Sequence, residues 1–104
     1  MGVIFVDIDE TICYTPADRD YSKAAPIKDR IIKINKLYNG GDTIIYWTAR
    51  GSQTGIDWSA VTRKQFKDWG VKYHDLMFGK PNYDLFIDDK NINAKEFFKD
   101  GRRR

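Results

Sequence analysis

The feature that most constrains the fold is the stretch VIFVDIDET near the N-terminus. Four apolar residues, Val3–Val6, run directly into Asp7, Asp9 and Glu10, three acids within four positions. Acids crowded at the end of a buried segment repel one another, so they are costly unless a cation or a phosphate chemistry uses them. The stretch therefore predicts a buried strand that ends in a functional site.

Other apolar clusters predict the rest of a sheet. We expect strands at Thr43–Trp47, at roughly Tyr73–Phe78 and at Leu85–Ile87, in addition to the first strand at Val3–Val6. The first, second and fourth runs are apolar without alternation, which is typical of parallel strands covered on both faces.

Helical patterns separate these strands. Pro26 suits a first helical position and Gly40-Gly41 ends that segment, while Ser59–Trp69 forms a second pattern that stops at Gly70. A third helix is expected from a capping box at Asn93. The order of elements predicts an α/β fold, a Rossmann-like three-layer sandwich around a mainly parallel sheet.

Length and charge bound the class of protein. The 104 residues suit one domain, expected at residues 1–101, and the net charge of +3 is supplied by a basic tail at 102–104. Such a tail is typical of a solvated end, with a polyanion-binding arm as the alternative. One cysteine and no apolar run near the roughly 20 residues of a membrane span predict a cytoplasmic protein without a membrane partner.

Polar residues follow the predicted strands at their carboxyl ends, where ligands bind in parallel α/β sheets. Four carboxylates with a lysine and hydroxyls suit a hard cation held by oxygen, Mg²⁺ first, and a phosphoryl group. A calcium loop is disfavoured because Ile12 stands where that loop needs glycine. The residues are Asp7, Asp9, Thr11, Thr48, Arg50, Lys80, Asp88 and Asp89.

Four short motifs in this order resemble the haloacid dehalogenase (HAD) superfamily of phosphatases. VDIDET resembles the first motif, hhhDxDxT with h apolar; IIYWT resembles the second, GKP the third and LFIDD the fourth. The resemblance implies that Asp7 is the nucleophile that becomes an aspartyl phosphate. It also implies that Asp9 protonates the leaving oxygen and then activates water. An acid at position 9 favours phosphatase or phosphomutase chemistry within the superfamily.

The resemblance further implies where a metal and a phosphate would bind. Mg²⁺ would lie on the Asp7 carboxylate, the Asp9 main-chain carbonyl and Asp88, with Asp89 holding a metal-bound water or orienting the lysine. The residues expected to contact substrate are Thr11, Thr48, Arg50 and Lys80; for Arg50 a structural ion pair is the alternative.

The intervals between the motifs have no room for a cap domain. Specificity must then come from Tyr14–Ala25, from Gly51–Trp58 or from a second subunit that covers the open site. The stretches WTARGS and FGKPNYDLFIDDK resemble short phosphatases of capsular and surface polysaccharide synthesis, which implies a sugar phosphate as substrate.

Two alternatives stay open. The capless phosphatase half of polynucleotide kinase-phosphatases is similar around Arg50 and Thr62-Arg63-Lys64, which implies a polynucleotide 3′-phosphatase or a nucleotidase. A response-regulator receiver, a switch and not an enzyme, also carries acids, a threonine and a lysine at strand ends. It is disfavoured because Lys80 precedes the last acidic pair instead of following it.

Overall fold

A computed structural model of the chain describes residues 1–101. The basic tail expected at 102–104 lies outside the described residues.

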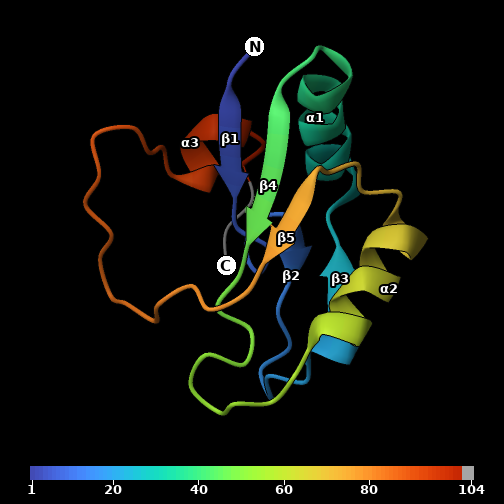
Figure 1. Cartoon of the computed structure of the whole chain (residues 1–104), viewed down its shortest axis with the longest axis vertical. Helices are drawn as coiled ribbons and strands as arrows, with labels where there is room; N and C mark the ends of the chain where they lie inside the picture. Colours follow the sequence, from blue (N-terminus) through green and yellow to red (C-terminus); the bar gives the residue numbers. More distant parts are fainter. Residues whose placement is uncertain (102–104) are drawn as a thin grey trace.

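The centre of the fold is a parallel sheet of three strands in the order β1-β4-β5 (Figure 1). The strands are β1 (Val3–Val6), β4 (Thr43–Trp47) and β5 (Asp75–Met77). Val6 pairs with Tyr46 in the register of the sheet, so the carboxyl ends of β1 and β4 reach the same edge. The α/β class and the parallel sheet predicted from the sequence are confirmed.

Three α-helices accompany the sheet within residues 1–101. They are α1 (Lys28–Asn39), α2 (Ser59–Trp69) and α3 (Ala94–Phe98). Gly70 ends α2 with a left-handed φ of 70°, and the Asn93 side chain accepts a hydrogen bond from the Lys95 main chain at the start of α3. Both ends agree with the sequence prediction. Within residues 1–101 no helix is long and apolar enough to cross a membrane.

Between β1 and α1 the chain forms a small excursion of its own. The two-residue strands β2 (Cys13–Tyr14) and β3 (Ala25–Pro26) pair antiparallel, and a short 3₁₀ helix, η1 (Tyr21–Lys23), lies between them. We call residues 15–24, which β2 and β3 hold at both ends, the flap. Pro26 therefore ends a strand, and α1 begins two residues later than its position suggests.

The helices cover one face of the sheet. Ile44 and Tyr46 of β4 are fully buried, whereas Val3 and Phe5 on the other face of β1 are 65% and 55% exposed. The helix α3 packs its aromatic rings beside Arg30 and Lys33 of α1 and does not cover that second face. The burial of β1 on both faces, and with it the third layer, is thus not found in the described part of the chain.

The fourth strand expected at Leu85–Ile87 is wrong for this structure. The chain runs without helix or strand from β5 to α3, as a wide loop in Figure 1, and Leu85 and Ile87 are 75% and 87% exposed. Three apolar residues between Asp84 and Asp88 offer few ladder hydrogen bonds against the entropy cost of ordering the segment. As a result β1 keeps an unpaired edge among the described residues.

Candidate active site at the strand ends

A tight turn after β1 presents the first two acids. The main-chain N–H groups of Thr11 and Ile12 both donate to the Ile8 carbonyl, at 3.1 and 2.9 Å, and Ile8 and Ile12 are fully buried. These anchors fix the turn from the core side, while Asp7 and Asp9 line a cleft on the other side. Side chains therefore alternate beyond the end of β1, with Ile8 facing the core and Asp7 and Asp9 facing the cleft.

The cleft has a volume of about 580 Å³ and is open to solvent. Its walls come from the turn after β1, from the flap through Arg19 and Tyr21, from the loop after β4 through Arg50, and from Lys80 to Tyr83 after β5. Part of the predicted Tyr14–Ala25 segment thus lies at the site, as expected. The carboxyl ends of all three strands contribute to one cleft.

Asp7 lies opposite Lys80 in this cleft, with 3.7 Å between Oδ1 and Nζ. Burial raises the pKa of Asp7, and the nearby Lys80 ammonium opposes that shift; the Asp7 side chain stays 39% exposed. The Lys80 main chain donates to the Thr48 carbonyl at 3.1 Å, which anchors the lysine beside β4. A nucleophilic carboxylate facing a cation can bind and attack an anionic phosphoryl group.

Thr11 and Thr48, the two threonines expected to contact substrate, lie beside the cleft and do not line it. The Thr48 hydroxyl is buried and accepts a hydrogen bond from the Arg50 main chain at 3.1 Å. The Thr11 carbonyl accepts a hydrogen bond from Arg30 of α1 at 3.2 Å, which ties the turn after β1 to that helix. Their predicted contacts with substrate stay predictions.

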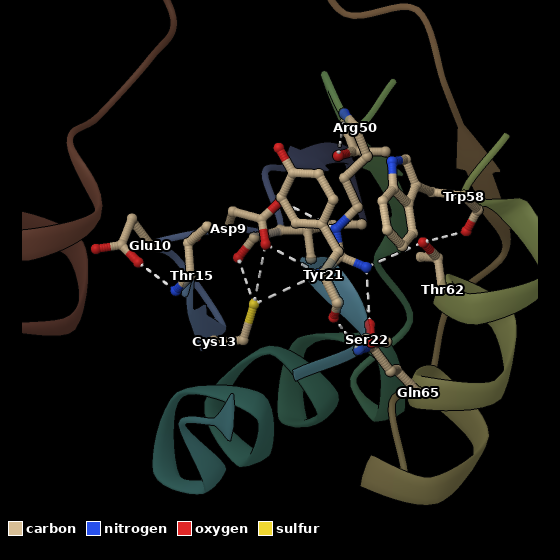
Figure 2. Close-up of polar contacts among 12 residues, drawn as sticks. Asp9, Glu10, Cys13, Thr15, Tyr21, Ser22, Arg50, Trp58, Thr62 and Gln65 are labelled. Carbon is tan, nitrogen blue, oxygen red and sulfur yellow. Dashed lines mark hydrogen bonds and ion pairs between the residues drawn. The ribbon is translucent and has the colours of Figure 1, made fainter. Parts of the chain in front are cut away.

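Asp9 is held by a buried guanidinium (Figure 2). Arg50 donates from Nε to Oδ2 at 3.0 Å and from Nη2 to Oδ1 at 2.9 Å, and its side chain is 0% exposed. Such a bidentate pair fixes the plane of the carboxylate as well as its position.

The other donors of Arg50 are also taken. Nη1 donates to Thr62 Oγ1 at 3.0 Å and to Gln65 Oε1 at 2.7 Å, and Nη2 approaches Cys13 Sγ at 3.8 Å. Since a guanidinium has five N–H donors, none is left for a substrate in this arrangement. Of the two interpretations from sequence, the geometry favours the structural ion pair for Arg50.

Cys13 lies under the same carboxylate. Its thiol is fully buried with Sγ 3.4 Å from Asp9 Oδ1. Burial, and then the Asp9 charge, raise the pKa of the thiol far above its ordinary value, so it is a neutral donor and not a nucleophile.

Sequence reasoning missed Thr62 and Gln65 as partners of the site. Both lie on the buried face of α2 with Phe66, whereas Arg63 and Lys64 are exposed to solvent. Two polar residues three positions apart on an otherwise apolar helical stripe indicate a buried polar partner. That pattern could have pointed to Arg50.

The expected set of metal ligands is not assembled. Asp88 and Asp89 are exposed on the loop between β5 and α3, and residues 1–101 contain no group of three or more acidic, histidine or cysteine side chains placed to hold a metal. Both Asp9 oxygens face Arg50. Of the residues expected to hold the metal, only Asp7 and Asp9 line the cleft, so the residues in this arrangement do not fit a protein-held Mg²⁺.

Neither the family models nor the curated proteins that were compared with the sequence match it. Two solved structures share the fold. A crystal structure of a target protein from Vibrio cholerae is 25% identical with a TM-score of 0.82, covering 93% of this chain and 87% of that one.

A chain in the structure of a Pnkp1/Rnl/Hen1 complex is 14% identical with a TM-score of 0.63. The match covers 96% of this chain but 34% of the other, so this chain spans about a third of that length. At this identity the likeness concerns the fold alone.

Proposed function

We propose that the protein is a phosphomonoester hydrolase of the HAD type, with Asp7 as the nucleophile. The observation that carries the proposal is the Asp7–Lys80 pair, 3.7 Å apart in an open cleft, with Asp9 two residues further on and fixed by Arg50. A receiver-like switch is less favoured because Lys80 precedes the last acidic pair of the chain instead of following it.

The reaction would proceed in two displacements. An Asp7 carboxylate oxygen attacks phosphorus, the bond to the leaving oxygen breaks, and Asp9 gives that oxygen a proton. A water then attacks the phosphorus of the aspartyl phosphate, Asp9 takes up its proton, and inorganic phosphate leaves with the Asp7 carboxylate restored. Lys80 balances the charge of the phosphoryl oxygens during both steps.

Asp9 keeps the capacity to act in both steps. Oδ1 accepts from Arg50 and from the Cys13 thiol, whereas Oδ2 accepts from Arg50 and keeps a second lone-pair position, and the side chain is 20% exposed at the cleft. The hydrogen bonds to Arg50 therefore orient Asp9 without closing it off from a substrate.

Mg²⁺ is proposed as the cofactor in a second arrangement of the chain. Among residues 1–101 the outer edge of β1 is unpaired, and Leu85–Ile87 is an exposed apolar run followed at once by Asp88 and Asp89. If this run paired with β1 in parallel, Asp88 would follow the strand end beside Asp7. Pairing would also bury the side chains of Leu85 and Ile87, which are otherwise exposed.

A sugar phosphate is the proposed substrate. The cleft of about 580 Å³ is open to solvent and is large enough for a phosphorylated ring. A polynucleotide 3′-phosphatase or nucleotidase is the second candidate, supported by the fold shared with a chain of the Pnkp1/Rnl/Hen1 complex. A second copy of the chain that covers the cleft stays a prediction.

The test is a phosphate-release screen in Mg²⁺ over sugar phosphates, nucleotides and 3′-phosphorylated oligonucleotides. We expect turnover that Asp7→Asn abolishes, with the exposed-site variant Asp68→Asn as the matched control at parent rate. If Asp7→Asn turned over substrate at the parent rate, Asp7 would not be the nucleophile. A salt-sensitive preference for oligonucleotides would select the second candidate. Stable phosphorylation of the parent without turnover would favour the receiver.

A further inference from the structure

Gln65 of α2 links the flap to the guanidinium that holds Asp9 (Figure 2). Its Oε1 accepts from Arg50 Nη1 at 2.7 Å, and its Nε2 donates to the main-chain carbonyl of Tyr21 at 2.6 Å. The residue is 8% exposed. The side-chain amide of Gln65 is therefore buried, with its oxygen bound to the Arg50 guanidinium and its nitrogen bound to the flap.

Aromatic contacts join the same two parts of the molecule. The Tyr21 ring lies 4.8 Å from the Arg50 guanidinium carbon and packs edge-on against Trp58, with 5.1 Å between ring centroids. Trp58 precedes α2, and its carbonyl accepts from the Thr62 hydroxyl at 2.8 Å. The short helix η1 cannot hold its place alone, so its position depends on α2.

We propose that Gln65 is a positioning residue that makes the orientation of Asp9 depend on the flap being packed against α2. The inference rests on the proposed function, in which Asp9 protonates the leaving oxygen. Removing the amide deprives Nη1 of one of its two acceptors, and a buried guanidinium with an unpaired N–H shifts to find another. The Asp9 carboxylate follows, because it is bound to two nitrogens of the same rigid plane.

A displaced Asp9 has a signature that a general loss of stability does not share. Proton transfer matters most when the leaving oxygen is a poor leaving group, as in an alkyl phosphate. It matters little for nitrophenyl phosphate, whose leaving group departs as an anion. A displacement of about 1 Å can cost up to about a hundredfold in rate. A positioning defect should therefore slow alkyl phosphates selectively.

The experiment compares Gln65→Met with the parent and with Gln53→Met, the same change at the other, exposed glutamine of the chain. Single-turnover release of the leaving group is measured on both substrates by rapid quench. We expect Gln65→Met to lose about tenfold on the alkyl phosphate and less than about threefold on nitrophenyl phosphate, and Gln53→Met to match the parent.

A double variant with Asp9→Asn tests whether Gln65 affects the rate through Asp9. Added to Asp9→Asn, the Gln65→Met change should cost little further rate, since residues that act through one another are not additive. Trypsin cleavage after Arg19 or Lys23 in the flap should be faster in Gln65→Met by at least about threefold. Equal losses on both substrates, additivity with Asp9→Asn, or unchanged flap cleavage would each overturn the proposal.

A second variant covers the case in which Gln65→Met does not fold. Gln65→Glu keeps an acceptor for Arg50 and loses the donor to Tyr21, so it should show the faster flap cleavage with a smaller loss of rate. A parent that hydrolyses neither substrate would reject the proposed function. An active parent with Gln65→Glu cleaved like the parent would reject the role of Gln65 alone.

Discussion

Arg50 and Asp9 form a bidentate ion pair whose guanidinium has no solvent exposure, at distances of 3.0 and 2.9 Å. The two residues are 41 positions apart in the sequence, so the pair joins the turn after β1 to the loop after β4. The acid proposed to move a proton is thereby part of the framework of the fold. Changes to this pair are expected to affect stability and rate together.

Arg50→Lys is expected to lower the free energy of unfolding by about 3 kcal/mol, because one ammonium cannot replace five directed donors in a buried site. Urea denaturation followed by circular dichroism measures the change. The control is Arg63→Lys on the exposed face of α2, expected within about 0.5 kcal/mol of the parent. Equal stability of the two variants would mean that the buried network contributes little.

Asp7→Asn is expected to stabilise the fold at neutral pH, measured in EDTA. Because burial raises the pKa of Asp7, the folded state holds this proton more tightly than the unfolded state. Stability of the parent therefore falls as pH rises from the ordinary carboxyl range through the raised pKa. The asparagine variant lacks that fall, so its Tm should exceed the parent's at pH 7 and the gap should shrink toward pH 4. A lower Tm at pH 7 would show that Lys80 outweighs burial.

Tyr46→Phe is expected to leave the free energy of unfolding unchanged or to raise it by about 1 kcal/mol. The Tyr46 side chain is fully buried, and its hydroxyl has no hydrogen-bond partner among the described residues. Deleting a buried polar group that lacks a partner removes a desolvation cost. Thermal melts of this variant beside Tyr83→Phe, at a 47% exposed position, provide the comparison. A loss above about 1 kcal/mol would reveal a partner for the hydroxyl.

Mg²⁺ with a phosphate analogue is expected to slow amide hydrogen exchange in β1 and in residues 84–88 together. Strand pairing between them would protect both, and exchange reports it without any turnover. Asp88→Asn should abolish the added protection, while Asp84→Asn, before the apolar run, should retain it. If Mg²⁺ protected the amides equally in Asp88→Asn and Asp84→Asn, Asp88 would not be a ligand of the metal.

The sequence predicted those helices and strands that have a long apolar pattern or a clear capping residue. The run Thr43–Trp47 forms β4, and Gly70 closes α2, because apolar burial and a left-handed cap act locally. Leu85–Ile87 has the right composition for a strand, but three residues do not decide their own pairing. Whether this run is buried depends on tertiary contacts, which the periodicity of its sequence does not predict.

The site was predicted in part for a similar reason. Asp7 and Lys80 could be placed because parallel strands deliver their carboxyl ends to one edge. Gln65 could not, since its role depends on where α2 packs relative to the flap. The same holds for Arg30, which binds both carboxylate oxygens of Asp100 from 70 positions away, at 2.6 and 2.9 Å.

The unpaired edge of β1 bears on how the protein behaves in concentrated solution. An open strand edge beside exposed Val3 and Phe5 is a template for strands of other molecules. Pairing within the chain and pairing between chains then compete for the same row of main-chain groups. Conditions that bring residues 84–88 onto β1 should also keep the protein free of aggregates during storage.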